Sequence, residues 1–335
     1  MVARAPYLIR RLSVWAAMAI AVAGMVACAP RIQPRGAPVH EPILTDQAMI
    51  ATDGAELPAR RWLPESEVRA VVVAVHGFND YSHAFADIGA ALAGQGIAVH
   101  AYDQRGFGAT ARPGIWAGTE ALVDDLRQIC ALLRTRYPSL PLFVLGDSMG
   151  GAVTMVGLAR GVLGPIDGAI LVAPAVWGRE TMNLFYRAAL WLSAHTVPWL
   201  RASGRGLDIT PSDNREMLIA LGRDPLVIKE TRIDAVWGIA DLMDAALAAA
   251  PALTTPLLVA YGAHDEIIPR TPTLLMLDRL SGPRRIAVYP DGWHMLLRDL
   301  QAGVVHADIA AWITDPAAPL PSGHDHDWRP LLATP

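Results

Sequence analysis

The sequence contains little cysteine, almost no lysine and no excess of basic residues. These shortages argue against a disulfide and against a nucleic-acid-binding surface. Its two cysteines, Cys28 and Cys130, are not expected to pair with each other. Cys28 ends an N-terminal apolar run, and Cys130 lies in a predicted amphipathic helix, where a small buried thiol is the ordinary role. Lys229 is the only lysine, and 32 acidic residues outnumber 28 basic ones. Without an excess of basic charge, no nucleic-acid-binding surface is expected.

The N-terminus has the pattern of a secretory signal. An apolar run over 12–29, interrupted by one serine, follows three arginines, Arg4, Arg10 and Arg11. The run reaches Met25-Val26-Ala27-Cys28, which resembles a bacterial lipoprotein cleavage site. We therefore predict a signal peptide over 1–27, lipidation of Cys28, and attachment to a membrane of the bacterial cell envelope, in the periplasm or at the outer membrane. An uncleaved anchor, since the run approaches spanning length, and cleavage to a free periplasmic form are the alternatives.

Strand and helix patterns alternate through most of the chain. Strands are predicted at 48–52, 57–63, 71–75, 97–102, 142–146, 168–173, 256–261 and 285–289. Helices are predicted at 85–94, 120–137, 149–160 and 296–313. This alternation predicts an α/β fold with a mostly parallel, doubly wound sheet.

The other segments have different compositions. Residues 28–43 contain several prolines and are expected to form an extended linker that holds the domain off a membrane. Helical patterns over 177–250 interrupt the alternation and predict a helical cap over the carboxyl edge of the sheet. The core then comprises 44–176 and 251–315. The proline-containing segment 316–335 is expected to be a flexible tail, and its His-Asp-His-Asp sequence is more typical of an exposed acidic tail than of a metal site.

The sequence Gly146-Asp147-Ser148-Met149-Gly150 lies between a predicted strand and a predicted helix. A serine at such a turn adopts a strained backbone conformation, and glycines two residues away on each side leave room for the strand and the helix to pass. The helix N-terminus places a positive dipole beside any oxyanion that forms. We therefore predict that Ser148 is a nucleophile.

Three further segments fit a serine nucleophile. The strand at 71–75 ends in His76-Gly77-Phe78, where the backbone N–H groups of Phe78 and Met149 are expected to form an oxyanion hole. Asp265 follows the strand at 256–261 and can orient a histidine. Its neighbour Glu266 is the rival acid.

The expected general base is His294. It follows the strand at 285–289 and the turn Pro290-Asp291-Gly292, and His306, inside the next predicted helix, is the nearby competitor. The order Ser148, Asp265, His294 is the order of nucleophile, acid and base in the α/β-hydrolase fold.

Five segments together resemble the monoacylglycerol lipase and lysophospholipase branch of the α/β-hydrolases: His76–Asp80, Tyr102–Gly108, Gly146–Gly151, Asp265 and His294. The resemblance covers about residues 44 to 315. It implies an α/β-hydrolase fold with a helical cap and a lipid-like ester as substrate, and it implies no metal or organic cofactor. The chain departs from the family at Asp147, where His or Gln is frequent. This aspartate could alter the local field or point to solvent.

The predicted cap is rich in aromatic and other apolar residues. Any small helical cap needs a core, and most of these side chains are expected to form it. A minority, represented by Trp177, Phe185 and Trp191, are expected to line a pocket for an acyl chain.

The sequence therefore predicts a serine hydrolase that cleaves carboxylic esters of lipid-like substrates through an acyl-enzyme. The same catalytic residues also serve aminopeptidases, thioesterases and perhydrolases, and the fold does not choose among them. Dehalogenases and epoxide hydrolases are disfavoured, because their nucleophile is an aspartate. A non-catalytic envelope lipoprotein on this scaffold is the alternative from another class of function.

Overall fold

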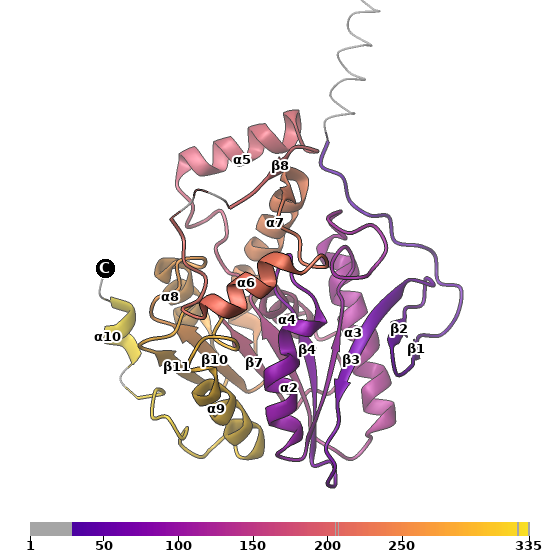
Figure 1. The fold of residues 1–335 in the computed structure, drawn as a ribbon, viewed down its shortest axis with the longest axis vertical. Helices are drawn as coiled ribbons and strands as arrows, with labels where there is room; N and C mark the ends of the chain where they lie inside the picture. The colour runs from indigo at the N-terminus through magenta and orange to yellow at the C-terminus, as the bar shows by residue number, and fades with distance from the viewer. Residues whose placement is uncertain (1–28, 205, 207, 327, 334–335) are drawn as a thin grey trace, which may run out of the picture.

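The computed structural model describes residues 29–204, 206, 208–326 and 328–333. In these residues nine strands form one sheet, in the order β1-β2-β3-β5-β4-β6-β7-β10-β11 (Figure 1). The antiparallel edge consists of β1 (Ile43–Leu44), β2 (Ala48–Ile50) and β3 (Glu56–Trp62). The parallel part consists of β4 (Ala70–Val75), β5 (Ile97–Tyr102), β6 (Leu142–Asp147), β7 (Gly168–Val172), β10 (Leu257–Gly262) and β11 (Arg284–Tyr289). The predicted doubly wound, mostly parallel sheet is confirmed.

The parallel strands are buried on both faces, which explains their uninterrupted apolar sequences. In β4 every residue is buried, and alternate side chains enter two different cores. Val71, Val73 and Val75 join the core beneath α3 (Thr119–Arg136), α4 (Met149–Ala159) and α8 (Arg270–Arg279). Val72 and Ala74 join the core beneath α2 (Ala86–Ala93) and α9 (Ala302–Thr314). The sheet is therefore the middle layer of three.

The segment predicted as a cap contains α5 (Leu184–Thr196), β8 (Arg201–Ala202), α6 (Arg215–Arg223), β9 (Thr231–Arg232) and α7 (Ile233–Ala249). The strands β8 and β9 form a separate antiparallel pair. The helix α7 packs against α4 and α3 and contributes Leu242, Ala246 and Leu247 to the core. The helix α5 lies at one end of the molecule and packs against α7 (Figure 1).

The N-terminal segment differs from the extended linker that we expected. Residues 31–39 lie on the domain instead of standing away from it. The backbone N–H of Gln33 donates to the carbonyl of Trp116 at 2.8 Å, and that of Val39 donates to the carbonyl of Thr52 at 2.8 Å. Proline only favours an extended conformation, and here the extended segment bonds to the domain surface. The predictions for residues 1–27 and for Cys28 lie outside the described residues.

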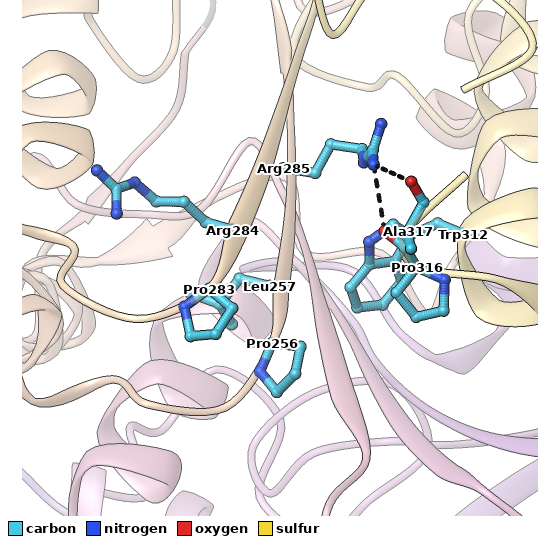
Figure 2. A pocket seen from close by; sticks show the side chains of 8 residues that line it. All are labelled: Pro256, Leu257, Pro283, Arg284, Arg285, Trp312, Pro316 and Ala317. Atoms are coloured by element: carbon cyan, nitrogen blue, oxygen red, sulfur yellow. Dashed lines mark hydrogen bonds between the residues drawn. The ribbon is translucent and has the colours of Figure 1, made fainter. Parts of the chain in front are cut away.

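The C-terminal segment also differs from expectation, because its described residues pack on the sheet edge rather than extending as a free tail. Arg285 of β11 donates to the carbonyls of Pro316 and Ala317 (Figure 2). Ser322 donates to the carboxylate of Asp308, and the segment ends in a short helix, α10 (Trp328–Ala333). These polar partners on the core hold a segment whose composition alone suggested mobility.

In the part of the chain that the structure describes, no helix is both long enough and apolar enough to cross a membrane.

Candidate active site

Ser148 stands at the sharp turn between β6 and α4. Its backbone angles are φ 49° and ψ −110°, a conformation that L-residues rarely adopt. A Cβ on Gly150 would lie 1.8 Å from the carbonyl oxygen of Val75, and one on Gly146 would lie 2.6 Å from that of Gly150. Glycine is therefore required at both positions, and the turn projects Ser148 beyond the carboxyl end of the sheet.

The structure brings Ser148, His294 and Asp265 together from three loops that follow β6, β11 and β10. His294 Nε2 lies 3.0 Å from Ser148 Oγ, and His294 Nδ1 lies 2.8 Å from Asp265 Oδ2. All three residues are buried. The other carboxylate oxygen of Asp265 accepts the backbone N–H groups of Ile267 and Ile268 at 2.8 and 2.9 Å. The acid is thus fixed, and the arrangement can pass a proton from the serine hydroxyl to the imidazole.

Neither competing residue takes part in this arrangement. The carboxylate of Glu266 accepts the backbone N–H of Thr210 in the cap at 2.6 Å. His306 lies within α9, and its Nε2 is 3.0 Å from the carbonyl oxygen of Leu297. Asp265 and His294 are therefore the acid and the histidine that meet Ser148.

Charge around the imidazole favours its protonated form. Burial opposes a charge on His294, but the charge and the hydrogen bond of Asp265, with a further contribution from Asp147, keep its pKa above the ordinary 6.5. Asp147 does not point to solvent, since its exposed fraction is 9%. Burial raises the pKa of Asp147 to about 6, although Arg298 and His294 act in the opposite direction.

The loop after β4 lies against the nucleophile. A Cβ placed on Gly77 would lie 3.4 Å from Ser148 Cβ and 3.4 Å from Asp147 Oδ2. The buried His76 ring links this loop to the loop after β5: its Nδ1 lies 2.8 Å from the carbonyl of Gly77, and its Nε2 accepts the backbone N–H of Gln104 at 2.9 Å. The ring of Phe78 packs edge-on against two other aromatic rings, those of Phe107 and Trp116.

The backbone N–H of Met149 is suited to bind an anion. Met149 is the first residue of α4, and the first N–H groups of a helix have no acceptor within the helix. The expected oxyanion hole at Phe78 and Met149 thus has one member on a loop beside Ser148 and the other at a positively polarised helix end.

The three cap residues expected to line an acyl pocket are not buried around a cavity. Phe185 is 75% exposed and Trp191 is 55% exposed, both on α5. Trp177 is partly buried and meets the ring of Tyr186 edge-on. The expectation assumed that aromatic residues of a cap face inward, but α5 packs only along the side that contains Ala194.

A cavity of about 300 Å³ lies at the starts of β10 and β11, lined by Leu257, Arg284 and Trp312 among others (Figure 2). It lies at the opposite edge of the sheet from Ser148. Among the described residues, no group of three or more His, Cys, Asp or Glu is arranged to hold a metal ion.

Sequence reasoning missed several buried polar residues around the triad. Asp299 accepts the backbone N–H of Trp293 at 2.8 Å and the hydroxyl of Ser212 at 2.6 Å. Arg298 pairs with Asp80 at 2.5 Å and thereby joins the His294 loop to the loop after β4. The only sequence signal was the pair of charged residues four and five positions after His294, which does not distinguish a buried network from a solvated turn.

Comparisons with known proteins show the family and the fold of this chain. The sequence pattern of the family described as "Serine aminopeptidase, S33" matches residues 66–301. The monoacylglycerol lipase of Mycolicibacterium smegmatis is 26% identical over 275 residues, which are 80% of this chain and 96% of the relative. The monoglyceride lipase of Homo sapiens is 25% identical, with 85% of this chain and 95% of the relative covered. The crystal structure of a soluble variant of monoglyceride lipase from Saccharomyces cerevisiae, in complex with a substrate analog, matches the fold with a TM-score of 0.68 at 21% identity, covering 85% of this chain and 98% of that one.

Replacing Asp147 with Asn is expected to move the pH dependence of Ser148 reactivity to lower pH. The serine reacts when His294 is neutral, so its rate should rise with pH through the pKa of His294. Removing the nearby negative charge destabilises the imidazolium, and the midpoint should fall by roughly half to one pH unit. The measurement is the rate of labelling by a fluorophosphonate between pH 5 and pH 9 (roughly the range in which His titrates). The control is Glu65→Gln, which removes the same charge from an exposed site. A midpoint that stays in place or rises would contradict the effect.

Proposed function

Because the chain belongs to the serine aminopeptidase family S33 and has an α/β-hydrolase fold, we propose that it is a serine hydrolase that cleaves carboxylic esters of lipid-like substrates, with monoacylglycerols and lysophospholipids as the first candidates. The observation that carries this proposal is the continuous hydrogen-bonded row from Asp265 through His294 to Ser148 at the carboxyl edge of the sheet. The row supplies a nucleophile, a base and an orienting acid in contact.

The proposed reaction has two halves. Ser148 Oγ attacks the ester carbonyl carbon while His294 Nε2 takes the hydroxyl proton. The carbonyl oxygen becomes an oxyanion that accepts hydrogen bonds from the N–H groups of Phe78 and Met149. His294 then donates the proton to the leaving alcohol, and the acyl group remains on Ser148. In the second half a water molecule attacks the acyl-enzyme and His294 takes a proton from it. His294 then returns that proton to Ser148 Oγ as the carboxylic acid leaves.

An exposed apolar surface supports a lipid-like substrate. We use the term "α5 face" for the exposed residues of α5 and of the segment after it: Leu184, Phe185, Tyr186, Trp191, Leu192, Trp199 and Leu200. Large apolar side chains that gather exposed on one segment are typical of a site for a protein, a membrane or a ligand. We propose that the α5 face contacts a lipid surface, where the substrate resides. The names of the relatives from Mycolicibacterium smegmatis and Homo sapiens, a monoacylglycerol lipase and a monoglyceride lipase, support the same class of substrate.

The position of the N-terminal segment supports a membrane at this face. The backbone N–H of Arg31 donates to Asp234 at 3.3 Å. Next to it, Asp234 N–H donates to the carbonyl of Pro198, and Ile233 N–H donates to that of Leu200. The first described residues therefore lie beside the end of the α5 face (Figure 1). A lipidated Cys28, which we propose as the anchor to the bacterial envelope, precedes Arg31 by three residues.

An aminopeptidase is the second candidate, and the description of the matching family favours it. A substrate panel separates the two: monoacylglycerols and p-nitrophenyl esters of several chain lengths, with aminoacyl p-nitroanilides beside them. The ester proposal requires that kcat/KM for an ester exceed that for every amide. A clear preference for an aminoacyl amide would replace the ester proposal with the aminopeptidase.

Replacing Ser148 with Ala is expected to lower kcat by about 10⁴-fold or more, because the variant loses the covalent nucleophile.

A matched pair of variants tests the acid: Asp265→Asn should lose far more activity than Glu266→Gln, since Glu266 holds the cap through Thr210 and does not contact the imidazole. Steady-state kinetics on the best ester, with melting temperatures, measure both. Wild-type turnover in Ser148→Ala would contradict the assignment of Ser148 as the nucleophile. A greater loss in Glu266→Gln would contradict the assignment of Asp265 as the acid.

Replacing Cys28 with Ser is expected to release the protein from the membrane fraction or to stall its processing, because lipidation requires the thiol. Fractionation of the producing cells and mass spectrometry of the N-terminus give the answer. A wild-type chain that begins near Met1 would support an uncleaved anchor instead, and an unmodified chain that begins at a later residue would support a free periplasmic protein.

The double variant Phe185→Ser and Trp191→Ser is expected to lose activity on monoacylglycerol embedded in phosphatidylcholine vesicles by about tenfold or more, because burial of a large apolar side chain contributes about 1.5 to 3 kcal/mol. Hydrolysis of a soluble butyryl ester should stay within about twofold. Val162→Ser, exposed at the far end of α4, is the control. Equal losses on both substrates, together with a lower melting temperature, would assign these aromatics to cap stability.

A further inference from the structure

The helix α6 is held at its ends and not by a core. None of its residues is fully buried. Met217, Leu218 and Leu221 are the most covered, and each remains partly exposed. The segments on either side of the helix form hydrogen bonds with the rest of the domain. One segment bonds to the loops that carry His294 and Asp265, and the other bonds to the loop after β4. We use the term "cap bridge" for residues 210–231, which comprise α6 and these two flanks.

The first flank bonds to the loops that present His294 and Asp265. The carbonyl of Pro211 accepts the backbone N–H of Met295 at 3.0 Å, directly after the histidine. The hydroxyl of Ser212 donates to Asp299 at 2.6 Å. Asp299 in turn accepts the backbone N–H of Trp293 at 2.8 Å, directly before the histidine. The backbone on both sides of His294 is therefore bonded to the cap, on one side directly and on the other through one buried carboxylate.

The same flank makes further bonds to these two loops. Asn214 donates to the carbonyl of Arg298 at 2.9 Å, and Asp213 accepts the backbone N–H of Leu300 at 2.9 Å. The backbone N–H of Thr210 donates to Glu266, the residue after the catalytic acid, at 2.6 Å. Since these bonds involve consecutive residues of one short segment, the base loop and the acid loop share one support.

The second flank bonds to the loop after β4, which carries Phe78 and is called the oxyanion loop below. The side chain of Asn79 donates to the hydroxyl of Thr231 at 2.6 Å, and the backbone carbonyl of Asn79 accepts the backbone N–H of Ile228 at 3.0 Å. Asn79 has φ 66°, a conformation that costs free energy and persists where neighbouring contacts compensate that cost. Tyr81 donates to Asp224 at 2.7 Å. The residue directly after Phe78 thus depends on the cap for its backbone conformation.

From these contacts we infer that the cap bridge positions both halves of the catalytic machinery, with Ser212 acting on His294 through Asp299 and Thr231 acting on the oxyanion loop through Asn79. The inference rests on the proposed serine chemistry but not on the identity of the ester. Neither side chain touches the reacting atoms, so both are positioning residues. Displacement of a reacting group by about 1 Å costs about 100-fold in rate, and removal of one hydroxyl from each flank allows movements of that kind.

The test uses four single variants of the full chain. Ser212→Ala removes the hydrogen bond to Asp299, and Thr231→Val removes the hydroxyl while keeping the shape of the side chain. Thr231→Ser restores the hydroxyl and serves as the conservative rescue. Ser203→Ala, at an exposed position of the same cap, is the matched control for loss of a serine hydroxyl.

Three readouts are taken for each variant: the second-order rate of labelling by a fluorophosphonate, kcat and KM on a soluble butyryl ester, and the melting temperature. Ser212→Ala and Thr231→Val should lower the labelling rate and kcat by about 10- to 100-fold with KM within about twofold. Thr231→Ser and Ser203→Ala should stay within about twofold of the wild type.

Two results would overturn the inference. One is labelling within about twofold of wild type in both Ser212→Ala and Thr231→Val. The other is a loss in either variant that is accounted for by the unfolded fraction at the assay temperature. Because the labelling rate depends on Ser148 and His294 and not on the natural ester, a wrong substrate class would leave this test intact. Wild-type protein that labels no faster than Ser148→Ala would instead refute the proposed function.

Discussion

The close crossing of β4 and α4 is the constraint on which the site depends. The carbonyl of Val75 lies so near the path of α4 that only a glycine at 150 lets the helix start there. That crossing holds Ser148 in its unfavourable backbone conformation and brings the loop after β4 against the nucleophile. The buried apolar strands on either side resist any relaxation, because a packed interior does not accommodate a shift of one element without moving its neighbours.

The site is also crowded with acidic groups. Four residues near His294 are buried: Asp80, Asp265 and Asp299 in loops, and Asp147 at the end of β6. Such a cluster is tolerated when each carboxylate has a partner or shares a cation. Arg298 pairs with Asp80 and partly offsets the rise that burial causes in the pKa of Asp147, and Asp265 is paired with the imidazole. In the proposed reaction, the net effect of these charges, which raises the pKa of His294, would stabilise the imidazolium that forms when His294 takes the proton of Ser148.

Much of this arrangement was predictable, and for local reasons. Most of the parallel strands are short apolar runs that end in or next to glycine or polar residues, so their carboxyl ends, and the residues that follow them, could be located from sequence. Ser148 lies directly after such an end, Asp265 lies three residues after the end of β10, and His294 lies five residues after the end of β11. The sequence left Glu266 as a rival to Asp265, and the structure places only Asp265 against the imidazole.

What could not be predicted depends on partners that are distant in the chain. Ser212 and Asp299 are 87 residues apart, and Asn79 and Thr231 are 152 apart. No periodicity relates them. The outward direction of Phe185 on α5 was missed for a similar reason: an aromatic helix predicts burial only if a second layer covers it. The predictions for the N-terminal and C-terminal segments were wrong, because composition indicates the conformation that a segment prefers. It does not show which hydrogen-bond partners the domain surface offers.

The attachment of residues 31–39 to the domain limits the distance between the domain and an anchor at Cys28. A lipid on Cys28 would leave only three residues before the bond of Arg31 to Asp234, and three extended residues reach about 10 Å. So short a tether would hold the α5 face against the bilayer and would prevent the domain from moving away from the membrane into the periplasm. The search for substrate would then be confined to two dimensions, at an effective concentration of lipid set by the membrane itself.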